Sequence, residues 1–126
     1  MKKLLLVFVG LLCSLVISAQ TNFQELSLEK AREQARAENK PIFLDCYTSW
    51  CGPCKMLSPV LRELAEENAE ALKVGKINVD EQRELAMRFQ VSSIPMLVVF
   101  KDGKAVAKSV GYRPKSEIAA MLESAK

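Results

Sequence analysis

The sequence contains no histidine and only four cysteines, Cys13, Cys46, Cys51 and Cys54, among its 126 residues. A closed zinc site needs four nitrogen or sulfur ligands, and the only close pair of candidates is Cys51 with Cys54. Cys13 falls in an N-terminal leader pattern and Cys46 in an expected strand. We therefore expect no metal site within one chain. A metal shared between two chains would need a dimer, for which the sequence gives no sign, so a monomer is expected.

Other binding patterns are also missing. The chain has no Gly-rich nucleotide-binding motif, so no bound cofactor is expected. Lysine and arginine form no dense cluster interleaved with aromatic residues, which make up 6% of the sequence, so nucleic-acid binding lacks electrostatic support. The formal charge is +3, but residues 1–19 hold two of the eighteen basic residues and none of the fifteen acidic ones. The remainder is therefore nearly neutral.

The most informative feature present is the pentapeptide Trp50-Cys51-Gly52-Pro53-Cys54, which follows a short apolar run and opens a helical pattern. This spacing places two thiols about one helical turn apart, as in a dithiol that cycles with a disulfide. At a helix start, Cys51 would face unsatisfied N–H groups and the positive end of the helix dipole, and both favour the thiolate. We expect Cys51 to attack and Cys54 to resolve the mixed disulfide. Gly52 lets a partner backbone come close, and Pro53 has no N–H to lose in the first turn.

Residues 1–19 have the pattern of a secretory signal peptide. Two lysines precede an apolar stretch over residues 4–17, and small residues follow it. The stretch is shorter than the roughly 20 residues that span a bilayer, so we expect export rather than a permanent anchor. A lipid attached to Cys13 is the alternative, but the bulky Leu12 stands where such signals normally carry a small residue.

The remainder, residues 20–126, is long enough for one compact domain. Its run over 41–47 is apolar on both faces, as in a central strand, and 81–89 offers Leu85, Met87 and Phe89 to the core. The expected elements are a short segment near 22–26, a helix over 28–39, a strand over 41–47, a helix over 51–68, a strand over 72–80, a helix over 81–89, a hairpin of 96–100 and 105–110 around Lys101-Asp102-Gly103-Lys104, and a helix over 115–124. This order predicts an α/β fold with a central mixed β-sheet and helices on both faces.

Several separated motifs resemble the thioredoxin family over essentially the whole of residues 20–126. Besides the pentapeptide, these motifs are Leu44-Asp45, Lys55-Met56, Pro59, Lys76-Ile77-Asn78-Val79-Asp80, Ile94-Pro95 and Gly111. A chance pair of cysteines would not bring them along. Residues 30–57 also resemble exported thioredoxin-like domains, including the periplasmic terminal domain of membrane thiol reductases. The resemblance implies a thioredoxin fold and a location in the periplasm of a Gram-negative bacterium.

The resemblance gives Asp45 and Lys76 supporting roles. Asp45 lies in an otherwise apolar strand, where burial should raise the pKa of an unpaired carboxyl group. The resemblance implies that Asp45 is the base for the Cys54 proton and that Lys76 lies near Asp45. The alternative is an aspartate that caps a turn or pairs with Lys76.

The resemblance also implies a substrate-binding groove. Pro95 is cis in the family and faces the disulfide, which leaves the backbone around Ile94 free to pair with an extended substrate segment. The alternative is a simple strand-start proline. Gly111 is expected in the same groove, with a turn glycine as the alternative, and Trp50 at its rim rather than in the core. Cys46 is expected to be buried and inert, with a regulatory thiol as the alternative.

Three function classes compete. The first is an exported protein-disulfide reductase, fed with electrons by a membrane thiol reductase because its compartment is oxidising. The second is an oxidase or isomerase, which uses the same two cysteines at a different redox poise. The third is a non-catalytic module that binds extended chains. The intact Cys51, Cys54, Asp45 and Pro95 argue against the third class, because a pure binding module has no need of a dithiol.

Overall fold

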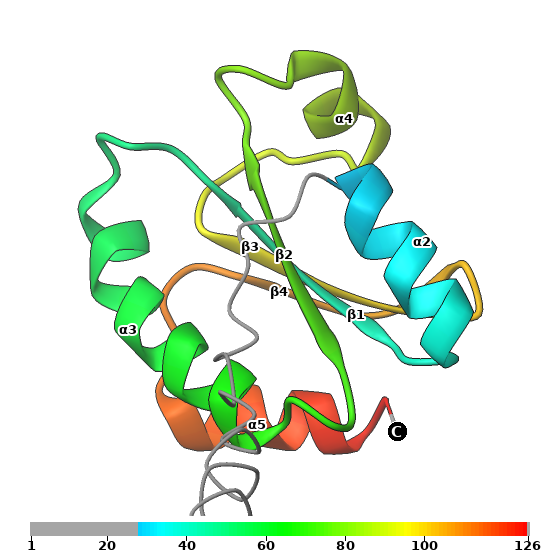
Figure 1. Cartoon of the computed structure of the whole chain (residues 1–126). Coiled ribbons are helices and arrows are strands. Elements are labelled where there is room, and N and C mark those ends of the chain that lie inside the picture. The colour runs from blue at the N-terminus through cyan, green and yellow to red at the C-terminus, as the bar shows by residue number, and fades with distance from the viewer. Residues whose placement is uncertain (1–27, 126) are drawn as a thin grey trace, which may run out of the picture.

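The computed structural model describes residues 28–125 (Figure 1). The predicted signal peptide over 1–19, with Cys13, and the segment near 22–26 lie outside these residues. The elements in chain order are helix α2 (Leu28–Glu38), strand β1 (Ile42–Tyr47), helix α3 (Gly52–Glu67), strand β2 (Lys73–Asn78), helix α4 (Arg83–Arg88), strand β3 (Met96–Lys101), strand β4 (Lys104–Val110) and helix α5 (Lys115–Glu123). None of the helices within 28–125 is long and apolar enough to cross a bilayer.

The strands form one mixed sheet in the order β2-β1-β3-β4. Strand β1 pairs parallel with β2 and antiparallel with β3, and β3 pairs antiparallel with β4. Because β1 has neighbours on both sides, its predicted central position is confirmed. Both faces of β1 are buried, as expected of a strand that reads as a continuous apolar run.

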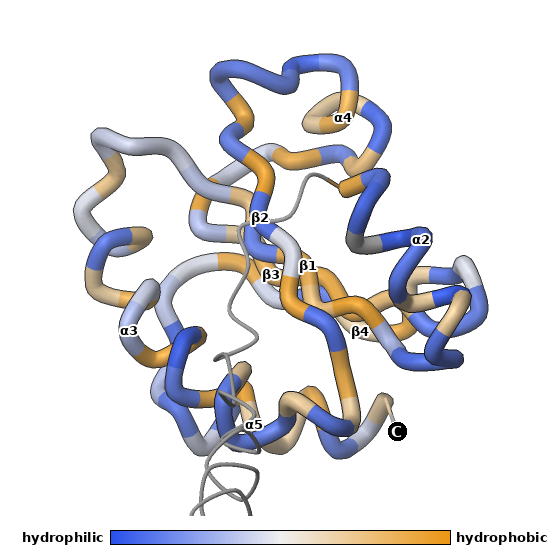
Figure 2. Tube along the Cα trace, viewed as in Figure 1, coloured by the Kyte–Doolittle hydropathy of each residue, from blue (hydrophilic) through white to orange (hydrophobic). Residues whose placement is uncertain are grey.

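Helices cover both faces of the sheet, so the predicted architecture is confirmed (Figure 1). Side chains alternate along β1, and Phe43 therefore packs on one face while Leu44 packs on the other. The first face is covered by α3 and α5, whose core residues include Leu61 and Ile118. The second face is covered by α2 and α4. Figure 2 shows the apolar colour concentrated on the strands, whereas α2 is largely hydrophilic.

One side chain of α4 differs from expectation, and the hairpin of β3 and β4 agrees with it. Met87 was expected to face the core, but it is 73% exposed, because Leu85 and the C-cap residue Phe89 are the side chains that α4 and its end turn toward the sheet. The predicted hairpin is confirmed, with a two-residue turn at Asp102 and Gly103. Both residues have positive φ, of 52° and 77°, which is the conformation that Asp-Gly favours in tight hairpins.

Candidate functional site

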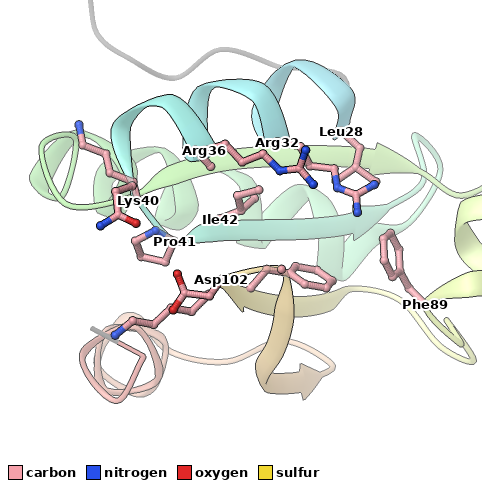
Figure 3. A pocket seen from close by; sticks show the side chains of 13 residues that line it. Leu28, Arg32, Arg36, Lys40, Pro41, Ile42, Phe89 and Asp102 are labelled. Atoms are coloured by element: carbon pink, nitrogen blue, oxygen red, sulfur yellow. The ribbon is translucent and has the colours of Figure 1, made fainter.

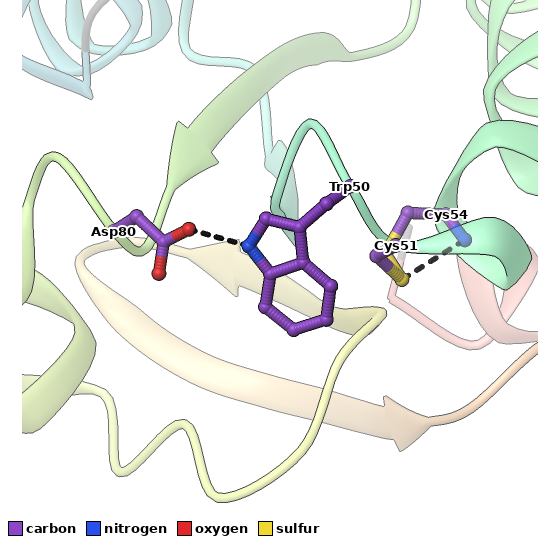
Figure 4. Close-up of a disulfide and its surroundings, with 4 residues drawn as sticks. All are labelled: Trp50, Cys51, Cys54 and Asp80. Carbon is purple, nitrogen blue, oxygen red and sulfur yellow. Dashed lines mark hydrogen bonds between the residues drawn. A yellow bond between two sulfur atoms is a disulfide. The ribbon is translucent and has the colours of Figure 1, made fainter.

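The two thiols of the pentapeptide are joined as a disulfide at the start of α3 (Figure 4). Cys51 is the N-cap of the helix, with an extended backbone, and its sulfur accepts a hydrogen bond of 3.2 Å from the backbone N–H of Cys54. The two Cα atoms are 5.3 Å apart. Gly52 and Pro53 form the first turn of α3, as the sequence predicted, and both are exposed.

This position favours nucleophilic chemistry at Cys51. When the disulfide is reduced, the Cys51 sulfur lies where the first N–H groups of α3 lack helical partners, and the helix dipole also stabilises a negative charge there. A stabilised thiolate is the reactive form of a cysteine. Cys51 and Cys54 are each 5% exposed in the disulfide form. Access to the sulfurs from solvent is therefore narrow.

Asp45 is buried on the face of the sheet that α3 covers. It has the same orientation as Phe43, two residues earlier in β1, and is only 2% exposed. Burial raises the pKa of its carboxyl group to about 6, and the nearby charge of Lys76 opposes this shift. Its Oδ1 atom has no hydrogen-bond partner within 28–125. The alternative of an aspartate that caps a turn does not fit a buried residue inside a strand.

Lys76 lies directly across from Asp45 in the parallel register of β1 and β2. Its ammonium group stands 4.2 Å from the centre of the Tyr47 ring, which is a cation–π contact. The predicted proximity of Lys76 to Asp45 is confirmed. Because burial outweighs the charge of Lys76, the carboxyl group keeps its proton to a higher pH than an ordinary aspartate does.

The register of β1 with β3 brings Pro95 and Gly111 to the same end of the sheet as the disulfide. Met96 pairs with Cys46 near the end of β1, and the Ile94–Pro95 peptide, which is cis, comes just before it. The backbone N–H of Gly111 donates a hydrogen bond of 2.8 Å to the carbonyl of Pro95. Gly111 has φ of 85°, and a Cβ atom placed there would meet nothing within 4 Å. The backbone here is therefore open to a partner, whereas the Pro95 side chain itself is buried.

Trp50 lies at the surface rather than in the core, as expected, and is 69% exposed. Its indole N–H donates a hydrogen bond of 2.7 Å to Oδ2 of Asp80 (Figure 4). The motif over 76–80 contains Asp80, but the resemblance assigns no role to this residue. A signal was present, because Asp80 follows β2 and the carboxyl ends of parallel strands meet at one edge of the sheet.

Cys46 lies outside the reactive arrangement. It is fully buried and belongs to the core on the face opposite Phe43. Burial raises the pKa of its thiol to about 12, and the charge of Asp45 adds to the rise. The expected burial of Cys46 is confirmed, and its inertness stays a prediction that the raised pKa supports. Within 28–125, no group of three or more cysteine, aspartate or glutamate side chains could hold a metal ion.

Comparisons with known proteins agree with this geometry. The sequence profile of the family described as Thioredoxin matches residues 18–124. The chain is 44% identical to thioredoxin of Bacillus subtilis over 96 residues, covering 74% of this chain and 92% of that protein. It is 44% identical to thioredoxin of Alicyclobacillus acidocaldarius over 90 residues, covering 71% and 86%.

Two solved structures have the same arrangement of elements. A mutant thioredoxin from Halobacterium salinarum superposes with a TM-score of 0.67 at 38% identity, covering 75% of this chain and 81% of that one. The germline-specific thioredoxin Deadhead from Drosophila melanogaster superposes with a TM-score of 0.70 at 29% identity, covering 78% and 93%. The expected fold is therefore confirmed.

The raised pKa of Asp45 predicts a pH-dependent effect of Asp45→Asn. The folded state binds this proton more tightly than the unfolded chain, so the associated stability is present below the ordinary pKa of 3.8 and is lost as pH rises to about 6. At pH 7.5 the ionised carboxylate should destabilise the oxidised protein by roughly 3 kcal/mol. Replacing it with a neutral amide should then raise the free energy of unfolding by roughly 1–3 kcal/mol at pH 7.5.

Urea unfolding of the oxidised protein at pH 7.5 and at pH 4 measures this effect. At pH 4 the gain should largely vanish, because Asp45 is then protonated in the folded state. Asp102→Asn, in the exposed hairpin turn, is the matched control and should show no pH-dependent difference. An equal gain from Asp45→Asn at both pH values would contradict the assignment.

Proposed function

The chain belongs to the thioredoxin family and is a disulfide oxidoreductase, and from this premise we propose that it is an exported reductase of protein disulfides. The observation that carries the proposal is the Cys51–Cys54 pair at the N-terminus of α3, at the same end of the sheet as the cis Ile94–Pro95 peptide. The dithiol supplies the two electrons of the reaction, and the backbone near Pro95 offers a place for the substrate chain.

In the proposed reaction, the Cys51 thiolate attacks one sulfur of a substrate disulfide. A bond forms between Cys51 and that sulfur, and the other substrate sulfur leaves as a thiolate, which takes up a proton. Cys54, deprotonated, then attacks the Cys51 sulfur and releases the second substrate thiol. Two electrons have passed to the substrate, and the Cys51–Cys54 disulfide seen here is the product form of the protein.

Asp45 is the proposed base for the Cys54 proton. It sits under α3, and its pKa of about 6 lets it be ionised at neutral pH, while burial keeps it ready to take up a proton. Lys76, across the strand pair, holds this pKa from rising further. The carboxylate oxygen without a hydrogen-bond partner supports this role, because it leaves an acceptor available.

The proposed substrate groove is bounded by three features at one end of the sheet. The backbone at Ile94 and Pro95 can add an extended substrate segment as a short strand. Gly111, next to Pro95, presents no side chain to such a segment. Trp50 offers an exposed aromatic surface beside Cys51, and Asp80 holds its indole ring in place.

An exported reductase also needs a source of electrons. In an oxidising compartment the disulfide form accumulates unless electrons are supplied, so we propose a membrane thiol reductase as the donor. The support for export is the pattern of residues 1–19, which combines a basic start, an apolar stretch and small residues. The periplasm of a Gram-negative bacterium is the proposed location.

Replacing Cys54 with Ser should trap substrates on Cys51. The variant can attack a disulfide but cannot release the mixed disulfide, so covalent complexes that dissociate on reduction should accumulate in cells. Cys46→Ser is the matched control and should give no such complexes, because Cys54 is intact in this variant and resolves the mixed disulfide. Non-reducing gel electrophoresis after acid quenching reads both variants. Failure of Cys54→Ser to yield any reducible complex would count against the exchange mechanism.

The reduction potential of the Cys51–Cys54 couple tests the direction of the reaction. Equilibration against glutathione or a dithiol buffer, read by thiol alkylation, should give a value near about −270 mV, which is the thioredoxin end of the scale. Such a couple donates electrons to disulfides of higher reduction potential. A value near about −120 mV would replace the reductase by a disulfide donor.

Export predicts a defined N-terminus. When the full chain is produced in a Gram-negative host, the periplasmic fraction should contain a protein that begins at Gln20, as measured by intact mass. Leu6→Arg places a charge in the apolar stretch over 4–17 and should leave the protein uncleaved and inside the cell. Recovery of the unaltered chain only in the cytoplasm, still beginning at Met1, would overturn the proposed location.

A further inference from the structure

A second concave site lies at the end of the sheet opposite the disulfide (Figure 3). It is a cavity of about 380 Å³ between α2, the start of β1 and the hairpin turn of β3 and β4. Ile42, at its floor, begins β1, whereas the disulfide loop follows the last residue of that strand, Tyr47. With a rise of about 3.3 Å per residue, the two sites are separated by roughly 17 Å along β1.

The floor of the cavity is apolar. Its side chains come from segments far apart in the sequence and include Leu28, Ala35, Ile42, Phe89 and Phe100. The rings of Phe89 and Phe100 are 5.3 Å apart between centroids and form a tilted aromatic pair. The volume falls within the roughly 300–1,000 Å³ of small-molecule sites, in which a few polar groups accompany apolar walls.

The rim of the cavity is mainly basic. Four cationic side chains line it, Arg32, Arg36, Lys40 and Lys101, against one carboxylate, Asp102. Figure 3 shows Arg32 and Arg36 along α2 above Ile42, with Lys40 and Asp102 toward the other end of the cavity. Lys40 is already paired with Glu38 at 2.7 Å.

The two arginines are the groups available to a ligand. Arg32 and Arg36 are exposed, one helical turn apart, and neither forms an ion pair or a side-chain hydrogen bond within 28–125. Guanidinium groups bind carboxylates through two parallel hydrogen bonds, and two of them beside an apolar wall concentrate positive potential.

We propose that this cavity binds a small amphipathic anion, in which a carboxylate is carried on an aliphatic body. The aliphatic part would lie on the floor formed by Ile42, Phe89 and Phe100, and the carboxylate would meet Arg32 and Arg36 at the rim. The proposal does not rest on the disulfide chemistry, because no residue of this cavity belongs to the site around Cys51.

The test uses sodium octanoate as the probe and two-dimensional amide NMR of the purified protein as the readout. Saturable shifts should appear at α2, at Phe89 and at the 101–103 turn, and not around Cys51. In the series from hexanoate to decanoate, affinity should rise by about fourfold for each methylene buried, until the cavity is full. Octylamine, which has the same chain and the opposite charge, should bind at least tenfold more weakly than octanoate.

The variant Arg32→Gln/Arg36→Gln should weaken octanoate binding about tenfold or more, because both charged donors are lost. Arg83→Gln/Arg88→Gln on α4 is the matched control, since it removes the same charge from an exposed helix outside this cavity, and its affinity should stay within about twofold. Disulfide reduction by the α2 variant should be unchanged, which separates this site from the proposed function. Equal binding of octanoate and octylamine, an unchanged affinity of the α2 variant, or no saturable shift at α2 and the turn would each overturn the proposal.

Discussion

The groups of the candidate site are held together by the hydrogen-bonded register of β1. Its parallel pairing with β2 sets Asp45 opposite Lys76 and brings the loop at Asp80 to the same edge of the sheet as Trp50. Its antiparallel pairing with β3 sets Cys46 opposite Met96 and brings the cis Pro95 peptide to that edge. A slip of one residue would turn every side chain of the strand to the other face and carry Asp45 away from α3.

Burial of the side chains of β1 has two effects. It supplies the apolar core on both faces of the sheet, through residues such as Phe43 and Leu44. The same burial shifts the pKa of Asp45 upward and that of Cys46 far upward. Burial therefore leaves a carboxyl group with a pKa of about 6 on the face toward α3, and it keeps the Cys46 thiol protonated on the opposite face. Stability and reactivity are set by the same packing.

The parts of the fold and of the candidate site that depend on residues close together in the chain could be predicted from the sequence. The dithiol at a helix start, the Asp102–Gly103 turn and the central position of 41–47 follow from spacing, turn chemistry and apolar patterning, and the structure confirms them. Resemblance to a family added the cis peptide at Pro95 and the neighbourhood of Asp45 and Lys76.

What could not be predicted depends on segments that meet only in the fold. The order of the strands indicates that Asp80 and Trp50 share one edge of the sheet, but the hydrogen bond between them depends on side-chain orientation, which no sequence period encodes. The outward orientation of Met87 could not be predicted, because a helix of six residues gives too short a pattern to show which side is buried. The cavity under α2 forms because the hairpin turn lies beside the start of β1, and these two segments are far apart in the sequence. The placement of β1 also has a consequence for biosynthesis. Strand β3 follows β1 only after α3, β2 and α4, so the sheet cannot form around β1 until most of the chain has been synthesised, and the two cysteines are made before the strand that completes their surroundings.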